Sequence, residues 1–169
     1  MQTIEKPRRA KRKKAAPANI HAYEVPRYRI ALVREDSMKA VTAPGLCSPE
    51  DVVRFVNPLF ETEPRELFVV LAIDTGHKII GHCVISAGGL ESAIVDARAV
   101  FQFATAVNAA RIILVHNHPS GRTEPSREDI AITNRLARCG EDMGIPVLDH
   151  VIWAYGVEGY SFGEHGNLR

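Results

Sequence analysis

Two histidines and an aspartate are spaced as ligands of a single metal ion. His116 and His118 follow an apolar run, and a spacing of two residues on an extended chain puts both imidazoles on one face, with Asn117 turned away. The ten residues between His118 and Asp129 are rich in Pro, Gly and Ser, so they can fold back to the strand end. Two imidazoles and one carboxylate suit a catalytic zinc ion, whose fourth position is left to water.

Asp129 also has a structural interpretation. Residues 126–129, Ser-Arg-Glu-Asp, have the pattern of a capping box at the start of a helix. A carboxylate fully engaged as a cap does not easily serve as a ligand too. A lone His-x-His pair is itself a weak signal. The residues around this pair and around the capping-box pattern are therefore needed to decide between a metal site and a helix cap.

The longer string, His-x-His-Pro-Ser-Gly followed by Pro-Ser-x-x-Asp, resembles the JAMM motif of JAB/MPN-type metalloproteases. That motif consists of His-x-His, seven residues, Ser, two residues and Asp, and the chain matches it at every position from His116 to Asp129. The Pro-Ser-Gly variant resembles the RadC-like branch, whose members were named as DNA repair proteins. The resemblance covers roughly residues 27–163, including the apolar run at 66–71, residues 86–95 and residues 148–150.

This resemblance implies an α/β protein with a cytidine-deaminase-like fold, in which a mixed sheet forms the middle of a three-layer α/β/α arrangement. It implies Zn²⁺ bound by His116, His118 and Asp129. It also implies hydrolysis of a peptide or isopeptide bond in a peptide or protein substrate.

The resemblance further implies a glutamate that acts as general acid and base. Glu66 fits this role because it immediately precedes a buried apolar run, with Glu61 and Glu63 as nearby alternatives. The other interpretation of Glu66 is an ordinary charge at a strand end. Ser126 matches the serine that would help to stabilise the oxyanion, and its other interpretation is the helix N-cap. His150, beside Asp149, could support a ligand, but a core histidine with satisfied hydrogen bonds is the preferred interpretation.

The elements that must position these residues alternate between strands and helices. Apolar runs and alternation predict strands over residues 28–33, 66–74, 79–86, 111–115, 147–154 and 160–162, with the second and third forming a hairpin. Capping and periodicity predict helices over residues 48–57, 96–107 and 126–143. Pro58 is expected to end the first helix and Gly144 to cap the last.

Composition divides the chain into a tail and one domain. Residues 1–22 are expected to be a disordered basic tail and residues 23–169 the RadC-like domain. Residues 1–19 hold seven basic residues against Glu5, a net charge of +6, whereas the remainder holds 14 basic and 19 acidic residues. Such a tail could bind nucleic acid non-specifically or could simply be solvated.

Location and rival chemistries are limited by what the sequence lacks. No apolar run approaches the roughly 18 residues of a membrane helix, and no secretory signal is expected. The three cysteines form no C-x-x-C pair, so a cytoplasmic location and no thiolate zinc site are expected. The motifs of zinc deaminases, thermolysin-like proteases and Walker-type nucleotide-binding proteins are missing.

Three function classes remain open. The first is a zinc metallopeptidase, the second is a DNA repair or replication accessory protein without peptidase activity, and the third is a metal-dependent nuclease. The peptidase is favoured because no fourth His or Cys lies near the motif to close a structural zinc site. A nuclease would more often gather several carboxylates around two hard cations.

Overall fold

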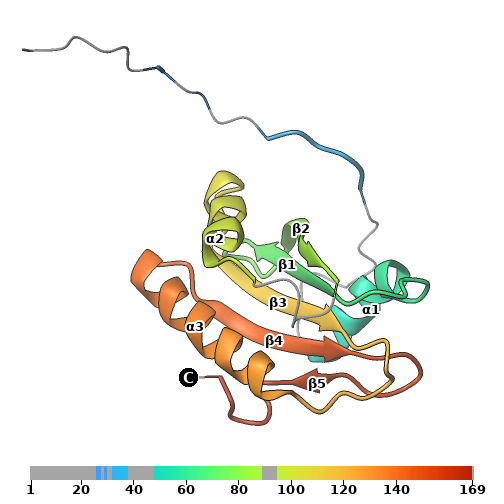
Figure 1. Cartoon of the computed structure of the whole chain (residues 1–169). Helices are drawn as coiled ribbons and strands as arrows, with labels where there is room; N and C mark the ends of the chain where they lie inside the picture. Colours follow the sequence, from blue (N-terminus) through green and yellow to red (C-terminus); the bar gives the residue numbers. More distant parts are fainter. Residues whose placement is uncertain (1–25, 28, 30–31, 38–47, 89–94, 169) are drawn as a thin grey trace, which may run out of the picture. The chain divides into compact units, whose positions relative to one another are not determined.

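A computed structural model describes residues 26–27, 29, 32–37, 48–88 and 95–168 (Figure 1). The chain divides into two units, residues 1–30 and residues 31–169, and every helix and strand of the described residues lies in the second. The tail predicted at 1–22 and its boundary with the domain lie outside the described residues, as do residues 89–94. Of the strand predicted over 28–33, residues 29, 32 and 33 are described, and none of them is in a strand.

A five-stranded sheet forms the middle of the second unit. Its strands are β1 (Leu67–Ile73), β2 (Ile79–Ala87), β3 (Arg111–Asn117), β4 (Val147–Trp153) and β5 (Tyr160–Ser161). Their order across the sheet is β2-β1-β3-β4-β5. Only β3 and β4 are parallel, whereas the other neighbouring pairs are antiparallel. The predicted hairpin and the mixed sheet are therefore confirmed.

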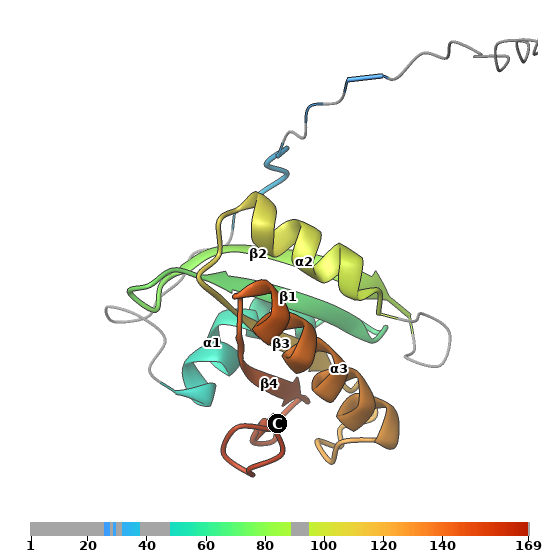
Figure 2. The same cartoon turned by 90° about the vertical axis from the view of Figure 1, so that its left-hand side faces the viewer.

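Helices cover both faces of this sheet, which gives the three layers seen in Figure 2. The helix α1 (Pro49–Phe60) packs on one face of the sheet, against Val69, Leu71 and the other side chains of β1 that point to that face. The helices α2 (Ala97–Ala106) and α3 (Arg127–Met143) pack on the opposite face, against Phe68, Val70 and their neighbours. Because both faces of β1 are covered, all seven of its residues are buried, as its continuous apolar run predicts.

The predicted end of the first helix is wrong. Pro58 lies inside α1, which continues to Phe60, and the Glu61 N–H still bonds to the Asn57 carbonyl. A proline in the last turn removes one hydrogen bond, but the side chain of Phe60 is buried against Trp153, with ring centroids 5.6 Å apart. Burial of a phenylalanine stabilises by about 1.5–3 kcal/mol, enough to hold this last turn in the helix.

The other helix boundaries follow the sequence closely. Asp96 caps α2 by accepting from the Arg98 N–H, and Ser126 caps α3. Gly144 ends α3 in the left-handed conformation, with φ 69°, which glycine adopts without strain. No helix within the described ranges is long and apolar enough to cross a membrane.

Candidate metal centre

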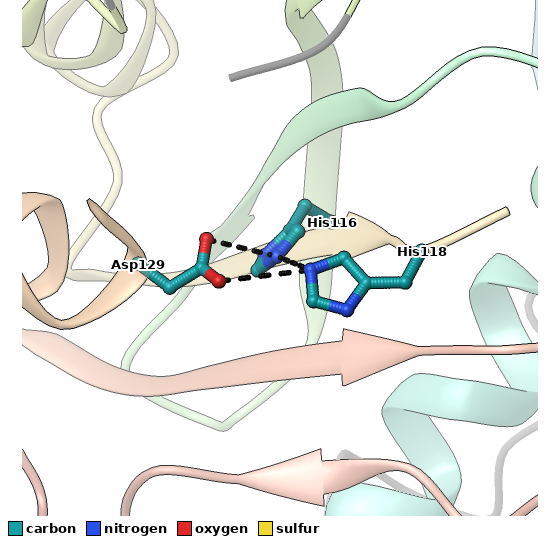
Figure 3. A group of neighbouring side chains, drawn as sticks. All are labelled: His116, His118 and Asp129. Atoms are coloured by element: carbon teal, nitrogen blue, oxygen red, sulfur yellow. Dashed lines mark hydrogen bonds and ion pairs between the residues drawn. The ribbon is translucent and has the colours of Figure 1, made fainter. Parts of the chain in front are cut away.

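His116, His118 and Asp129 converge at the end of β3, where α3 begins (Figure 3). Their ligand atoms all lie within 4.8 Å of one another. The Nε2 atoms of the two histidines are 2.9 Å apart. Asp129 Oδ1 lies 3.1 Å from His116 Nε2, and Oδ2 lies 3.6 Å from His118 Nε2. The three predicted ligands thus form one cluster that could hold a metal ion.

The local chain explains how the cluster forms. His116 lies on β3 facing α3, and the backbone N–H of His118 bonds to the Trp153 carbonyl at 2.8 Å, which keeps the chain extended beyond the strand. The loop over 119–125 then returns to the first turn of α3, where Asp129 faces the sheet. The side chains of His116 and Asp129 are 1% and 0% exposed, whereas that of His118 is 12% exposed. His118 is therefore the only one of the three described side chains that is partly exposed.

Asp129 acts as a cap with one carboxylate oxygen and leaves the other available. Its Oδ2 accepts from the Ser126 N–H at 2.8 Å and from the Ser126 hydroxyl at 2.6 Å. Ser126 Oγ in turn accepts from the Asp129 N–H, which completes the capping box. The buried Oδ1 accepts no hydrogen bond from any described residue. The cap therefore uses Oδ2 and leaves Oδ1 available, so the capping box does not by itself prevent Asp129 from holding a metal ion.

The charges of the cluster are strongly coupled. Burial alone would raise the pKa of Asp129, but the imidazoles of His116 and His118 and the Ser126 hydroxyl hold that pKa far below its ordinary value. Burial alone would lower the pKa of His118, but Asp129 and the Arg122 carbonyl raise it, with a smaller contribution from the charge of Glu66. Asp129 is therefore a carboxylate at neutral pH, as a metal ligand must be.

Outer contacts orient both imidazoles toward the cluster. His118 Nδ1 lies 2.7 Å from the Arg122 carbonyl, which can only accept, so Nδ1 carries the proton and Nε2 presents its lone pair. His116 Nδ1 lies 2.8 Å from His150 Nε2. Metal-binding histidines usually donate their second ring nitrogen in this way. The two Nε2 atoms and a buried carboxylate oxygen lie together, and this donor set fits a zinc ion.

His150 is the residue whose role the sequence underestimates. It is a buried core histidine with satisfied hydrogen bonds, as preferred, but one of those bonds goes to the ligand His116. Complete burial holds the pKa of His150 well below its ordinary value, with a smaller contribution from the neighbouring His116. The signal in the sequence is its place four residues into a buried strand that is parallel to the strand carrying His116.

Glu66 directly precedes β1, the strand that pairs with β3. In the antiparallel pairing of β1 with β3, Phe68 is the partner of His116, and their rings stack with centroids 6.2 Å apart. The pairing ends there, and the same register continued by two residues would bring Glu66 opposite His118. Its charge also contributes to the raised pKa of His118. The Glu66 carboxylate is therefore near enough to His118 to affect the pKa of that imidazole.

Asn117 fixes the backbone on both sides of Glu66. Its side chain turns to the other face of β3, where Oδ1 accepts from the Leu67 N–H at 2.7 Å and Nδ2 donates to the Arg65 carbonyl at 2.9 Å. The Glu66 carbonyl accepts from the Gly88 N–H of the neighbouring chain segment at 2.8 Å. The middle residue of His-x-His thus determines where Glu66 stands, a role that the sequence analysis did not assign.

The alternative glutamates lie in the segment between α1 and β1. Glu61 and Glu63 line a cleft of about 250 Å³ that reaches His118 and is also bordered by Trp153. Arg65 holds both carboxylate oxygens of Glu63, at 2.8 and 3.0 Å, and this contact lowers the pKa of Glu63. A carboxylate in a two-point ion pair is a poor base, so Glu63 is the weaker alternative.

Comparison with known proteins agrees with this geometry. Residues 46–167, more than half of the chain, match the family described as the RadC-like JAB domain. A UPF0758 protein of Salinibacter ruber is 44% identical over 133 residues, covering 79% of this chain and 54% of the relative. A UPF0758 protein of Methanosarcina acetivorans is 40% identical over 140 residues, covering 82% and 58%. One from Pelobacter propionicus is 47% identical over 121 residues, covering 72% and 52%. The chain thus spans little more than half the length of these curated relatives, and it belongs to the RadC-like JAB domain family.

Proposed function

We propose that this chain is a zinc-dependent hydrolase of peptide or isopeptide bonds. The observation that carries the proposal is the clustering of the two Nε2 atoms with Asp129 Oδ1, each residue being held by an outer contact. The set has three protein ligands and one partly exposed side, as catalytic zinc sites have. A structural site would be expected to close with a fourth protein ligand.

The residues around the ligands have separate tasks in this proposal. Zinc, when bound, acts as a Lewis acid and lowers the pKa of water to about 7. The Glu66 carboxylate takes the proton of the attacking water and later delivers it to the leaving amine. Asn117 holds Glu66 in place through the backbone of its two neighbours. The cleft beside His118 receives the substrate chain.

Ser126 takes a part that depends on its own hydrogen bond. Its single hydroxyl proton is directed to Asp129 Oδ2, so in the resting site it orients a ligand. To stabilise an oxyanion, that proton must turn from Asp129 toward the substrate oxygen. We therefore assign Ser126 first to orienting Asp129 and second to the oxyanion.

A peptide-library cleavage assay on zinc-loaded full-length protein tests the proposal. Glu66→Gln keeps the size of the side chain and removes the base, so cleavage should fall by about 10²–10⁴-fold. Glu128→Gln, an exposed neighbour of Asp129, is the matched control and should keep wild-type rates. Equal cleavage by wild type and Glu66→Gln would contradict the assignment, and loss in Glu61→Gln alone would move the role to Glu61.

A second candidate function rests on the basic tail. The net charge of +6 over residues 1–19 favours an accessory role on DNA or RNA, without hydrolysis. Single- and double-stranded DNA are therefore included beside the peptides. Binding of DNA that is indifferent to zinc and to Glu66→Gln, with nothing cleaved, would favour the accessory role.

A further inference from the structure

The two buried ligands of the candidate metal centre are joined by a second path behind it. His116 Nδ1 lies 2.8 Å from His150 Nε2, and His150 Nδ1 lies 2.5 Å from the Thr133 hydroxyl. That hydroxyl lies 2.5 Å from the backbone carbonyl of Asp129, one helical turn earlier on α3. A continuous chain of hydrogen bonds therefore runs from one ligand residue to another through the core.

The chemistry of the last acceptor sets the direction of every bond in this chain. A carbonyl oxygen can only accept, so the Thr133 hydroxyl donates to Asp129. The single O–H of this hydroxyl is used in that bond, so its oxygen can only accept from His150 Nδ1. A neutral His150 protonated at Nδ1 has a lone pair at Nε2, and so it accepts from His116 Nδ1. His116 is then left with its lone pair on Nε2, the atom that faces His118 and Asp129.

Packing holds His150 in the orientation that this chain needs. Its ring is fully buried, stacks on Phe162 with centroids 4.9 Å apart, and meets the edge of Phe68 at 5.5 Å. Its backbone N–H donates to the Asp149 carboxylate, which also accepts from the Ser161 hydroxyl of β5. The ring cannot turn over without displacing two phenylalanines, so the two nitrogens keep their partners.

We infer that His150 and Thr133 are positioning residues, which fix the tautomer of His116 and tie that tautomer to the helix turn that carries Asp129. A threonine that bonds the carbonyl four residues earlier is common in helices and alone would mean little. Here the same hydroxyl is also the acceptor for His150, which makes it the end of the chain. The inference rests on the proposed function only in taking His116 as a metal ligand.

Thr133→Val is the variant that tests this role, because it keeps the shape of the side chain and removes the hydroxyl. Thr133→Ser restores the hydroxyl and serves as the rescue. Thr105→Val, on the exposed side of α2, is the matched control for the change from threonine to valine. Long-range ¹H–¹⁵N NMR of the metal-free full chain reports which ring nitrogen of His116 carries the proton. Competition with a zinc-binding dye then reports zinc affinity.

In wild type, Thr133→Ser and Thr105→Val, the proton of His116 should lie on Nδ1. In Thr133→Val it should be shared between the two tautomers, and zinc affinity should fall about 10–100-fold, as when an outer partner of a ligand is lost. A wild-type His116 protonated at Nε2 would overturn the inference. So would a Thr133→Val protein with the wild-type tautomer and unchanged zinc affinity.

The tautomer measurement needs neither bound zinc nor hydrolysis, so it separates this inference from the proposed function. Peptide cleavage could fail while His116 keeps the expected tautomer and Thr133→Val loses it, which would refute the hydrolase alone. Circular dichroism of Thr133→Val guards against misfolding. If that variant is unfolded, the wild-type tautomer and that of Thr133→Ser still decide the outcome.

Discussion

Removing the side chain of Asn117 should destabilise the domain more than an ordinary polar substitution does. Asn117 is completely buried and makes two hydrogen bonds, one from the Leu67 N–H and one to the Arg65 carbonyl. In Asn117→Ala both backbone groups lose their partner. A buried polar group left unpaired costs about 1–3 kcal/mol.

The two groups should not contribute equally to the loss. The Leu67 N–H lies in a buried bond, so its cost belongs at the upper end of that range. The bond to the Arg65 carbonyl is only partly buried, so water can replace the amide at a cost near the lower end. Together they predict a decrease of about 2–4 kcal/mol in the free energy of unfolding. That is a large share of the roughly 5–15 kcal/mol typical of a domain.

Urea unfolding in the presence of a chelator measures this decrease without a contribution from bound metal. Gln102→Ala, an exposed amide on α2, is the matched control and should change the free energy by less than about 0.5 kcal/mol. An Asn117→Ala protein within about 1 kcal/mol of this control would refute the reasoning, because the two bonds would then be unimportant for holding β1 to β3.

Three further predictions concern the metal, the contact between α3 and the segment that follows it, and the tail. Zinc affinity should fall about tenfold per pH unit below the raised pKa of His118, because the imidazole proton must leave before metal binds; titrations between about pH 5.5 and 8.5 check this, and a flat profile would contradict it. Gly140→Ala should destabilise by about 1–3 kcal/mol in thermal unfolding although alanine favours helices, because its Cβ would lie 2.6 Å from the Ile145 carbonyl; an unchanged midpoint would show that this contact relaxes. Deleting residues 1–19 should abolish salt-sensitive retention on immobilised DNA at low ionic strength, and equal retention would show that the tail is only solvated.

The sequence predicts the fold well because local and long-range signals agree. The apolar run of β1 requires cover on both faces, and the caps at Asp96, Ser126 and Gly144 mark helix ends where the structure has them. The prediction fails at Pro58, where a local rule about the residue before proline competes with burial of Phe60. Rules based on neighbouring residues do not take such tertiary contacts into account.

The clustering of His116, His118 and Asp129 was predictable, because their spacing is fixed along one strand and one helix turn. The residues that support this cluster were not, because their contacts join distant parts of the chain. Thr133 and His150 meet across the interface of α3 with β4, and Asn117 reaches Leu67 at the start of β1 and Arg65 just before it. A single sequence states which residues are apolar or polar but not which strands become neighbours.

X-ray absorption at the zinc edge of the zinc-loaded full chain tests the central claim most directly. An open site at His116, His118 and Asp129 predicts one zinc per chain, with two imidazole nitrogens and two oxygens at about 2.0–2.2 Å. The two oxygens would come from Asp129 and from solvent, and Asp129→Ala should lose the metal while Glu66→Gln keeps it. A sulfur shell near about 2.3 Å, a third imidazole, or full zinc retention in Asp129→Ala would contradict the account.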